Sequence, residues 1–141
     1  MKYVAVAILS GAMLAAFQTN AHACDQKDVM SPHFLTIPIT SANYGKIAKS
    51  ALVQADALKS CIAQSSGHQK TQYLLMRAVA LSTAAQSMEN MAVADRTKEA
   101  LYVKEAVAIA TPIANDPNAL EREKKSARGI LTVGSWFKKN E

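Results

Sequence analysis

Aromatic residues, glycine, proline and cysteine are all scarce in this sequence. Aromatic side chains make up 6% of the 141 residues, and there are five glycines, four prolines and two cysteines. The sequence therefore has no collagen-like glycine period, and it has no glycine-rich loop of the kind that binds phosphate. Long low-complexity tracts are missing as well. Alanine is abundant instead, and a chain with many small and few aromatic side chains suits closely packed helices.

Motifs of the common catalytic and metal sites are also missing. The sequence has no G-x-S-x-G nucleophile elbow, no H-E-x-x-H pair and no C-x-x-C-H haem attachment sequence. Its carboxylates are scattered over predicted helix ends and polar faces, where capping and solvation account for them. A zinc cluster would need Cys24, His33, Cys61 and His68 at one end of the fold, and their spacing fits no zinc motif. We therefore predict no catalytic residue, no metal ligand and no cofactor.

One long apolar run is present, and it lies at the start of the sequence. Lys2 precedes 15 residues from Tyr3 to Phe17, and a short polar step then leads to Ala-His-Ala at residues 21–23. This is the layout of a secretory signal peptide, and 15 residues are fewer than the roughly 20 that a transmembrane helix needs. We expect cleavage after Ala23 and a soluble mature chain in the periplasm or outside the cell.

Cys24 stands directly after the expected cleavage site. A bacterial lipoprotein has a cysteine at this position, but its signal usually has leucine three residues earlier, where this sequence has Ala21. We therefore prefer ordinary signal-peptide cleavage to lipid attachment. Because exported proteins meet an oxidising environment, we expect the two cysteines to pair. A disulfide between Cys24 and Cys61 would tie the N-terminal arm to the body of the protein.

Residues 24–40 are predicted to form an extended arm, because they contain Pro32 and Pro38 and show no helical period. A strong amphipathic helix is predicted after the arm, with Ser41 as its N-cap and the Ser-Ser-Gly segment at 65–67 as its end. Its apolar positions recur at intervals of three and four residues. They are Tyr44, Ala48, Ala51, Ala55, Leu58 and Ile62.

Two further helices follow from the same periodicity. The second is predicted from about Gln69 to Met91, with Leu74, Ala78, Leu81, Ala85 and Met88 on one seam. It has no charged residue between positions 78 and 88, and we therefore expect it to be the most enclosed element. The third begins after Asp95 as its N-cap and should kink or end at Thr111-Pro112. Its buried side is predicted to contain Val103, Ala106, Val107, Ala110 and Ile113.

The segment Asn115-Asp116-Pro117 is typical of a turn, an N-cap and a proline at the first position of a fourth helix. Glu121 and Glu123 lie near the positive end of that helix, and its apolar side offers Leu120, Ala127, Ile130, Leu131 and Phe137. The pattern predicts an all-α fold, an antiparallel up-and-down four-helix bundle with an extended N-terminal arm. We divide the chain into a signal peptide (1–23), the arm (24–40) and a single four-helix domain (41–141).

Tyr44, Tyr73 and Tyr102 are spaced 29 residues apart, which raises the question of an internal repeat. Helices of similar length that each have one large residue at a similar depth give the same spacing, and we prefer this simpler explanation. Tetratricopeptide repeats are excluded, because aligning Pro117 with the closing proline of that family places Glu105 and Pro112 at positions that need small residues.

Basic residues crowd the predicted fourth helix, close to Trp136 and Phe137. The whole chain has 16 basic and 11 acidic residues, and removing residues 1–23 takes away only Lys2, so the net charge falls from +5 to +4. A basic helix with an aromatic end can contact an anionic membrane surface or a polyanion. The candidate anion-contact residues are Arg122, Lys124, Lys125, Arg128, Lys138 and Lys139.

These features lead us to expect an exported, non-enzymatic binding or protein-interaction module. Its partner would be a protein or another surface, and we expect no nucleic-acid partner. Two alternatives remain open at this stage. One is a protein that acts at anionic membranes or polyanions through its basic last helix, and the other is an enzyme of a type that the sequence motifs do not reveal.

Overall fold

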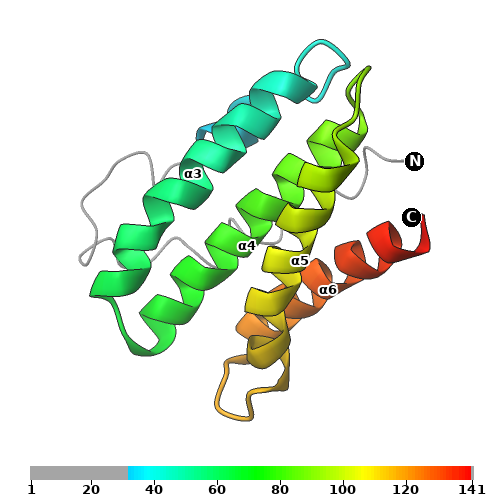
Figure 1. Ribbon diagram of the computed structural model, residues 1–141. Coiled ribbons are helices and arrows are strands. Elements are labelled where there is room, and N and C mark those ends of the chain that lie inside the picture. The colour runs from blue at the N-terminus through cyan, green and yellow to red at the C-terminus, as the bar shows by residue number, and fades with distance from the viewer. Residues whose placement is uncertain (1–31, 141) are drawn as a thin grey trace.

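A computed structural model describes residues 32–140, and these residues form a short 3-10 helix followed by four α-helices (Figure 1). No strand occurs among the described residues. The elements are η1 (His33–Thr36), α3 (Tyr44–Gln64), α4 (Gly67–Glu89), α5 (Arg96–Asn115) and α6 (Glu121–Lys139). The predicted all-α four-helix architecture is confirmed. The expected signal peptide, its cleavage site and Cys24 lie outside the described residues.

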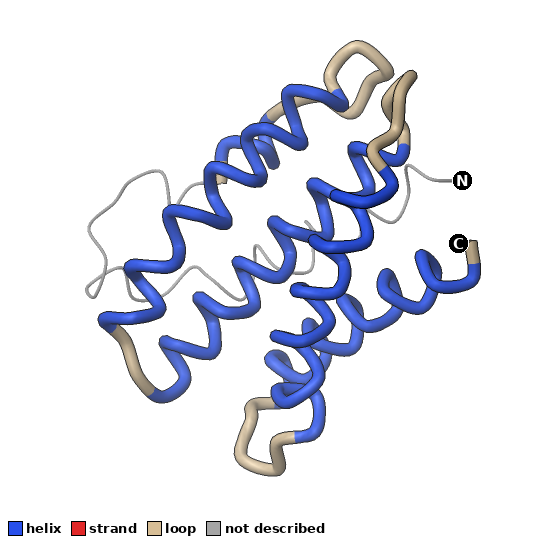
Figure 2. Tube along the Cα trace, viewed as in Figure 1, coloured by secondary structure: helices blue, strands red, loops and turns tan. Residues whose placement is uncertain are grey.

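Helix α4 lies at the centre of the bundle. It packs against α3 on one side and against α5 and α6 on the other, while α5 and α6 also pack against each other. Figures 1 and 2 show α3 and α4 side by side, with α6 passing obliquely behind α5. The described part of the arm lies along α3, where Phe34 of η1 is buried. Each connection between helices is short, as the up-and-down prediction requires.

The central position of α4 follows from its sequence. Residues 78–87 contain no charged and no aromatic side chain, and every one of them is buried. Small side chains allow neighbouring helix axes to approach closely. The main core contains nine alanines beside eight larger aliphatic residues and two phenylalanines. The prediction that this helix is the most enclosed element is confirmed. Its most buried alanines are Ala78, Ala80, Ala84 and Ala85, and alanines of the other helices at the same core include Ala51, Ala55, Ala106, Ala110 and Ala127.

The start of α3 differs from the prediction. Ser41 lies in a turn before the helix, and Asn43 occupies the N-cap position. The side chain of Asn43 does not cap the helix. Its Nδ2 donates to the Pro38 carbonyl over 3.0 Å, while the Asn43 carbonyl accepts from the Ile47 N–H. The chain therefore enters α3 two residues later than predicted, because Asn43 joins the arm to the first turn.

Helix α5 starts as predicted and ends later than predicted. The Asp95 carboxylate accepts from the Lys98 N–H over 3.1 Å and caps the helix. Pro112 lies inside α5, which continues to Asn115. Proline has no N–H to donate to the preceding turn, but Ile113 beyond it is buried and the Thr111 hydroxyl donates to the Val107 carbonyl over 2.8 Å. Packing thus keeps the last turn helical.

Helix α6 begins at Glu121, four residues after the proline that was expected to start it. The Asp116 carboxylate accepts from the Asn118 N–H over 2.8 Å and holds residues 116–118 in a turn instead. At the actual helix start, the Glu123 carboxylate accepts from the Leu120 N–H over 2.8 Å. Leu120 was predicted on the apolar side of the helix, and it lies exposed before the first turn.

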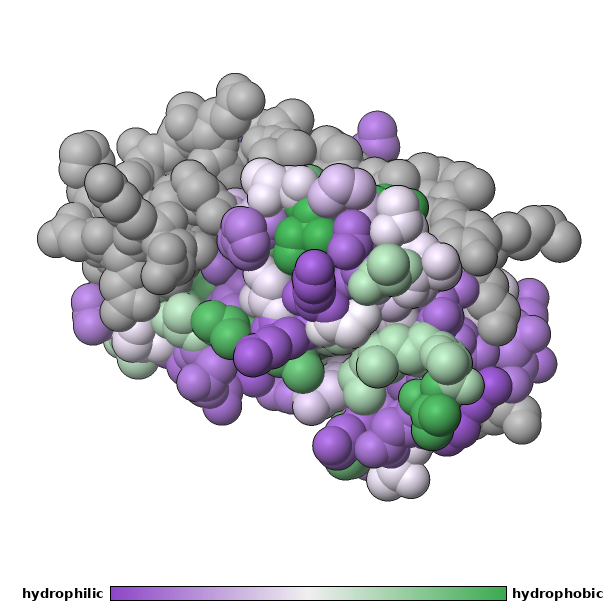
Figure 3. Space-filling view, turned by 90° about the horizontal axis from the view of Figure 1, so that it is seen from above, coloured by the Kyte–Doolittle hydropathy of each residue, from purple (hydrophilic) through white to green (hydrophobic). Residues whose placement is uncertain are grey.

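The outer surface of the described part of the chain is mostly polar. Arg77 on α4 joins three helices, because its Nε donates to the Ala55 carbonyl of α3 and its guanidinium pairs with Glu105 of α5. On the face that Figure 3 shows, hydrophobic residues form small patches between polar ones. None of the described helices has the length and apolar character needed to cross a membrane.

Gly134 of α6 lies close against the side chain of Val107 of α5. A Cβ atom at position 134 would lie 2.5 Å from Val107 Cγ2, and a valine side chain in a helix has little rotamer freedom to move away. We predict that Gly134→Ala lowers the free energy of unfolding by about 1–3 kcal/mol, since overpacking outweighs the gain in helix propensity. Urea denaturation followed by circular dichroism measures this change.

The matched control is Gly45→Ala on α3, where the new Cβ would meet only Met91 Cε at 3.8 Å. This substitution should leave stability unchanged or raise it by up to about 1 kcal/mol. In the double variant Gly134→Ala/Val107→Ala, the loss should be smaller than the sum of the two single losses. Additive losses would show that the two helices do not meet at this pair.

Candidate functional site

An open groove of about 490 Å³ lies between α5 and α6. We call it the α5–α6 groove. Gly134 and Val107, which approach each other closely, both belong to its wall. The wall is largely apolar, and its charged residues are two lysines, one from each helix. The lining residues are Ala100, Val103, Lys104, Val107, Leu131, Gly134, Ser135, Phe137 and Lys138.

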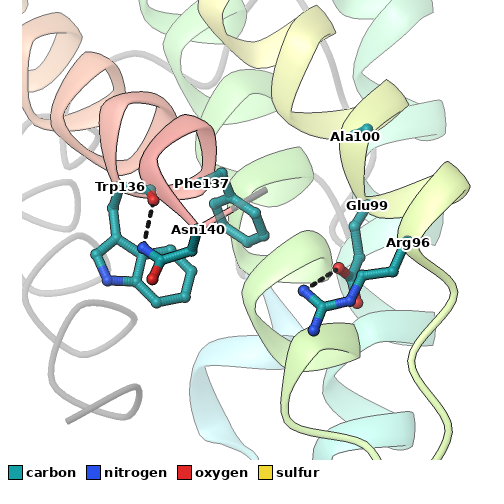
Figure 4. A pocket seen from close by; sticks show the side chains of 6 residues that line it. All are labelled: Arg96, Glu99, Ala100, Trp136, Phe137 and Asn140. Atoms are coloured by element: carbon teal, nitrogen blue, oxygen red, sulfur yellow. Dashed lines mark hydrogen bonds and ion pairs between the residues drawn. The ribbon is translucent and has the colours of Figure 1, made fainter.

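A second hollow of about 300 Å³ lies between the first turn of α5 and the last turn of α6. We call it the end cavity. It shares Ala100 and Phe137 with the α5–α6 groove. Figure 4 shows its two sides, with Trp136 and Phe137 of α6 and the C-cap residue Asn140 on one side and Arg96 and Glu99 of α5 on the other. The Trp136 and Phe137 rings meet edge to face with centroids 5.0 Å apart. The end cavity therefore has an aromatic side and a charged side.

Arg96 lies beside a pair of buried carboxyl groups, of which one, that of Glu99, belongs to a residue that lines the end cavity. Glu89 is the last residue of α4, and its side chain is 4% exposed; Glu99 on α5 is 2% exposed. Arg96 Nη1 lies 2.5 Å from Glu89 Oε2 and 3.7 Å from Glu99 Oε2. The Arg96 guanidinium is therefore shared by the two carboxylates and lies closer to that of Glu89.

The pKa of Glu99 is raised from its ordinary value of 4.5 to about 7, mainly by burial and also by the hydrogen bond and the negative charge of Glu89. Arg96 opposes this shift, while Asp95 adds to it. When both glutamates are ionised, neither can donate a hydrogen bond to the other. Glu99 Oε1 is then a buried oxygen without a hydrogen-bond partner among the described residues.

The six predicted anion-contact residues all lie on α6, and the structure divides them. Lys124 Nζ and Arg128 Nη2 lie 3.6 and 4.0 Å from the carboxylate of Glu121, which partly neutralises both. Arg122, Lys125, Lys138 and Lys139 are exposed, and none of them forms an ion pair within residues 32–140. Of the six, Lys138 alone lines the α5–α6 groove.

The two described histidines and the described cysteine have different surroundings. His68 Nδ1 is 3.1 Å from Glu123 Oε1, which joins the start of α4 to the start of α6. His33 lies on η1, where its carbonyl accepts from the Thr36 hydroxyl. Cys61 is fully buried on α3 beside Leu58, in a cluster separate from the main core. No cluster of three metal-ligating side chains occurs in the described part of the chain.

Sequence reasoning missed the buried carboxyl pair. It placed the acidic residues at helix ends and polar faces, whereas Glu89, Glu99 and Glu123 are buried. A signal was present for Glu99. The buried seam of α5 passes through Val103, Ala106 and Ala110, and one step of four residues backwards along it reaches position 99. The periodicity therefore predicts an inward-facing side chain there, whatever its charge.

The Glu99 carboxyl makes stability depend on pH. Because its pKa is about 7 in the folded protein and 4.5 ordinarily, the folded state binds more protons than the unfolded state between these values. The contribution of Glu99 to the free energy of unfolding should therefore be most favourable below about pH 4.5. It should decrease as the pH rises through about 7. We predict that Glu99→Gln removes this loss, on the order of 3 kcal/mol or less, and raises the melting temperature at pH 8.

Thermal melts from pH 4 to pH 8 measure this effect. Asp56→Asn is the control, because Asp56 is an exposed carboxylate on α3 that pairs with Lys59; its profile should keep the slope of the unmodified protein. If Glu99→Gln melts at a lower temperature than the unmodified protein at pH 8, the carboxylate stabilises the fold and its pKa is not raised.

The comparisons with known proteins identify no relative. No family model matches the chain, and no curated protein and no solved structure is significantly similar to it. The evidence for function is therefore the geometry of the α5–α6 groove, the end cavity and the charges around them.

Proposed function

We propose that this protein is an exported, non-enzymatic binding protein that holds an anionic amphiphile in the α5–α6 groove. By anionic amphiphile we mean a molecule with one acidic headgroup and one alkyl chain. The observation that carries the proposal is an apolar groove whose charged residues are all cationic. Its volume of about 490 Å³ falls in the range of small-molecule sites, roughly 300–1,000 Å³.

The apolar part of the groove suits an alkyl chain. Val103 and Val107 on α5 and Leu131 and Phe137 on α6 line the groove with apolar side chains. An alkyl chain placed there would remove apolar surface from water on both molecules, at about 25 cal/mol for each Å² buried. Burial of the chain would supply affinity without selecting a particular headgroup.

The charges at the groove select an acidic headgroup. Lys104 and Lys138 belong to its wall, and the wall contains no carboxylate. Neither lysine forms an ion pair within residues 32–140. A carboxylate or sulfate headgroup would gain two cationic partners, whereas an ammonium headgroup would be repelled.

A non-enzymatic role agrees with the composition of the groove. Ser135 is its one hydroxyl group, and the wall contains no histidine, cysteine or carboxylate. Nucleophilic catalysis by a serine needs a base within hydrogen-bond reach, which is most often a histidine. The groove residues therefore support binding and orientation better than bond cleavage.

Export is the second part of the proposal, and the signal-like segment before residue 24 supports it. In an oxidising compartment Cys24 would pair with Cys61, which lies fully buried on α3. The bond would close a loop with 36 residues between its ends, and the chain-entropy model assigns such a loop about 4 kcal/mol of stabilisation. The arm would thereby be joined to the end of α3 that is distant from η1.

The outer side of α6 favours a second candidate function, contact with an anionic membrane or a polyanion. Lys125, Arg128 and Lys139 fall on one exposed stripe of the helix, since their spacing returns them to nearly the same direction. Arg128 is partly neutralised by Glu121, and about 16 Å of helix separates it from Lys139. This separation makes the outer side a weaker anion site than the groove.

Binding of decanoate tests the groove. We expect decanoate to bind more tightly than decyltrimethylammonium, below the micelle concentration of either, because the two lysines discriminate between their charges. Lys104→Gln/Lys138→Gln should weaken decanoate binding about tenfold, if each exposed charge contact contributes up to about 1 kcal/mol. Calorimetry measures the affinity, and the fluorescence of Trp136, the one tryptophan of the chain, reports binding next to Phe137.

The matched control is Arg122→Gln/Lys125→Gln, which removes the same charge from exposed positions on α6 that do not line the groove. It should leave decanoate binding unchanged. If both double variants lose affinity equally, the effect is one of net charge and the groove is not the site. If the control variant alone loses binding to phosphatidylglycerol vesicles, the second candidate function is supported.

Thiol titration tests the disulfide. The exported protein, unfolded without reductant, should show no titratable thiol, because Cys24 and Cys61 are its two cysteines. Reduction should expose two thiols and lower the melting temperature, and Cys24→Ser/Cys61→Ser should melt at that lower temperature with or without reductant. Two titratable thiols before reduction would contradict the disulfide.

A further inference from the structure

Phe137 lines both hollows between α5 and α6. It belongs to the wall of the α5–α6 groove, of about 490 Å³, and to the wall of the end cavity, of about 300 Å³. Among the described residues, Ala100 of α5 is the one other residue that lines both. Figure 4 shows the Phe137 ring projecting from the end of α6 toward α5. We infer that this ring separates the groove from the end cavity.

The Phe137 ring is fixed in this position by its surroundings. Phe137 is 7% exposed and belongs to the main core. The Trp136 ring meets it edge to face, with the two centroids 5.0 Å apart. Ala100, the shared residue of α5, has only a methyl group and fills little space. The phenylalanine ring therefore contributes most of the material that closes the groove on the side of the end cavity.

The charged and apolar parts of the groove differ in exposure. Lys104 and Lys138 are exposed, whereas Phe137 is buried. An acidic headgroup stays at the exposed lysines, because removing its charge from water is costly, while the alkyl chain extends inward to buried apolar surface. The chain cannot extend between the helices at Gly134, where α6 lies against the Val107 side chain. The direction left for a longer chain is toward Phe137.

The length of the groove gives the scale of the chain. Its lining residues extend from Ala100 to Val107 on α5 and from Leu131 to Lys138 on α6, which is about 10 Å on each helix at 1.5 Å per residue. An extended peptide chain advances about 3.5 Å over three bonds, so an alkyl chain advances roughly 1.2 Å per bond. A carboxylate of about eight to ten carbons therefore spans the groove.

We propose, on the basis of the function proposed for the groove, that Phe137 limits the length of the alkyl chain and that the ligands are medium-chain carboxylates. A chain that reaches Phe137 buries all of its methylene groups, and the extra methylene groups of a longer chain remain in water. Without the ring, the groove and the end cavity become one space. A longer chain then continues along the aromatic side of the end cavity, next to Trp136.

A series of carboxylates from hexanoate to tetradecanoate, each below its micelle concentration, tests the proposal on the full-length protein. The affinity should rise about fourfold for each added methylene group up to about decanoate, and tetradecanoate should then bind no more than about twofold more tightly than decanoate. In Phe137→Ala, tetradecanoate should bind at least tenfold more tightly than decanoate. Calorimetry measures the affinities. In this variant, Trp136 fluorescence should respond more to tetradecanoate than to decanoate.

Two further variants keep the test independent of one substitution. Phe137→Leu retains a buried apolar side chain, and it should move the limit from about decanoate to about dodecanoate. Ala100→Leu adds a side chain at the other shared position. In the double variant Phe137→Ala/Ala100→Leu, this side chain should separate the two hollows again and return the limit to about decanoate.

Phe34→Ala is the matched control, because it removes the same ring from a buried position on η1 that lines neither hollow. It should lower the melting temperature and leave the chain-length limit at about decanoate. Lys104→Gln/Lys138→Gln should weaken all the carboxylates by a similar factor and also leave the limit in place, because the lysines contact the headgroup alone.

The results distinguish this proposal from the proposal for the groove. If carboxylates bind and the limit is the same in Phe137→Ala, Phe137→Leu and the unmodified protein, Phe137 does not set it, while the groove remains the site. If Phe34→Ala moves the limit as far as Phe137→Ala does, loosening of the core is the cause and the proposal is wrong. If no carboxylate binds the unmodified protein, both proposals are wrong.

Discussion

The close packing of α4 against its neighbours is the constraint on which the rest of the structure depends. Ten consecutive residues of α4, from Ala78 to Ser87, are buried and uncharged, so this helix must be covered on every side. Helices α3, α5 and α6 supply the cover. Because alanine fills much of the contact, the helix axes lie close together and leave little space for a ligand in the core. Binding sites must then lie at the periphery.

The pair α5 and α6 is where such space appears. These two helices must contact each other and α4 at once, and Gly134 lets α6 approach Val107 at one level. Larger residues such as Phe137 line the space beside this contact. The α5–α6 groove and the end cavity share Ala100 and Phe137. Both hollows therefore belong to the same pair of helices.

The sequence predicts the helices well because their buried seams are regular. The periodicity locates α3, α4 and α5 to within a few residues, and the Asp95 cap is found as expected. The predicted helix bounds are wrong where two local sequence signals compete. Asp116 and Pro117 resemble a helix start, but Glu123 caps the helix further on with help from a neighbouring helix through His68. A local sequence pattern contains no signal for a partner that is 55 residues away.

The end cavity could not be predicted for a related reason. Its buried carboxyl group also lowers the stability of the fold. An apolar residue at position 99 would continue the buried seam of α5 and would avoid the cost of a buried carboxyl. Glu99 instead shares Arg96 with Glu89, which leaves the group short of one positive charge or one proton. Solvation cannot supply either at a position that is 98% buried. A carboxyl in this state lowers stability at neutral pH, because burial disfavours its charged form.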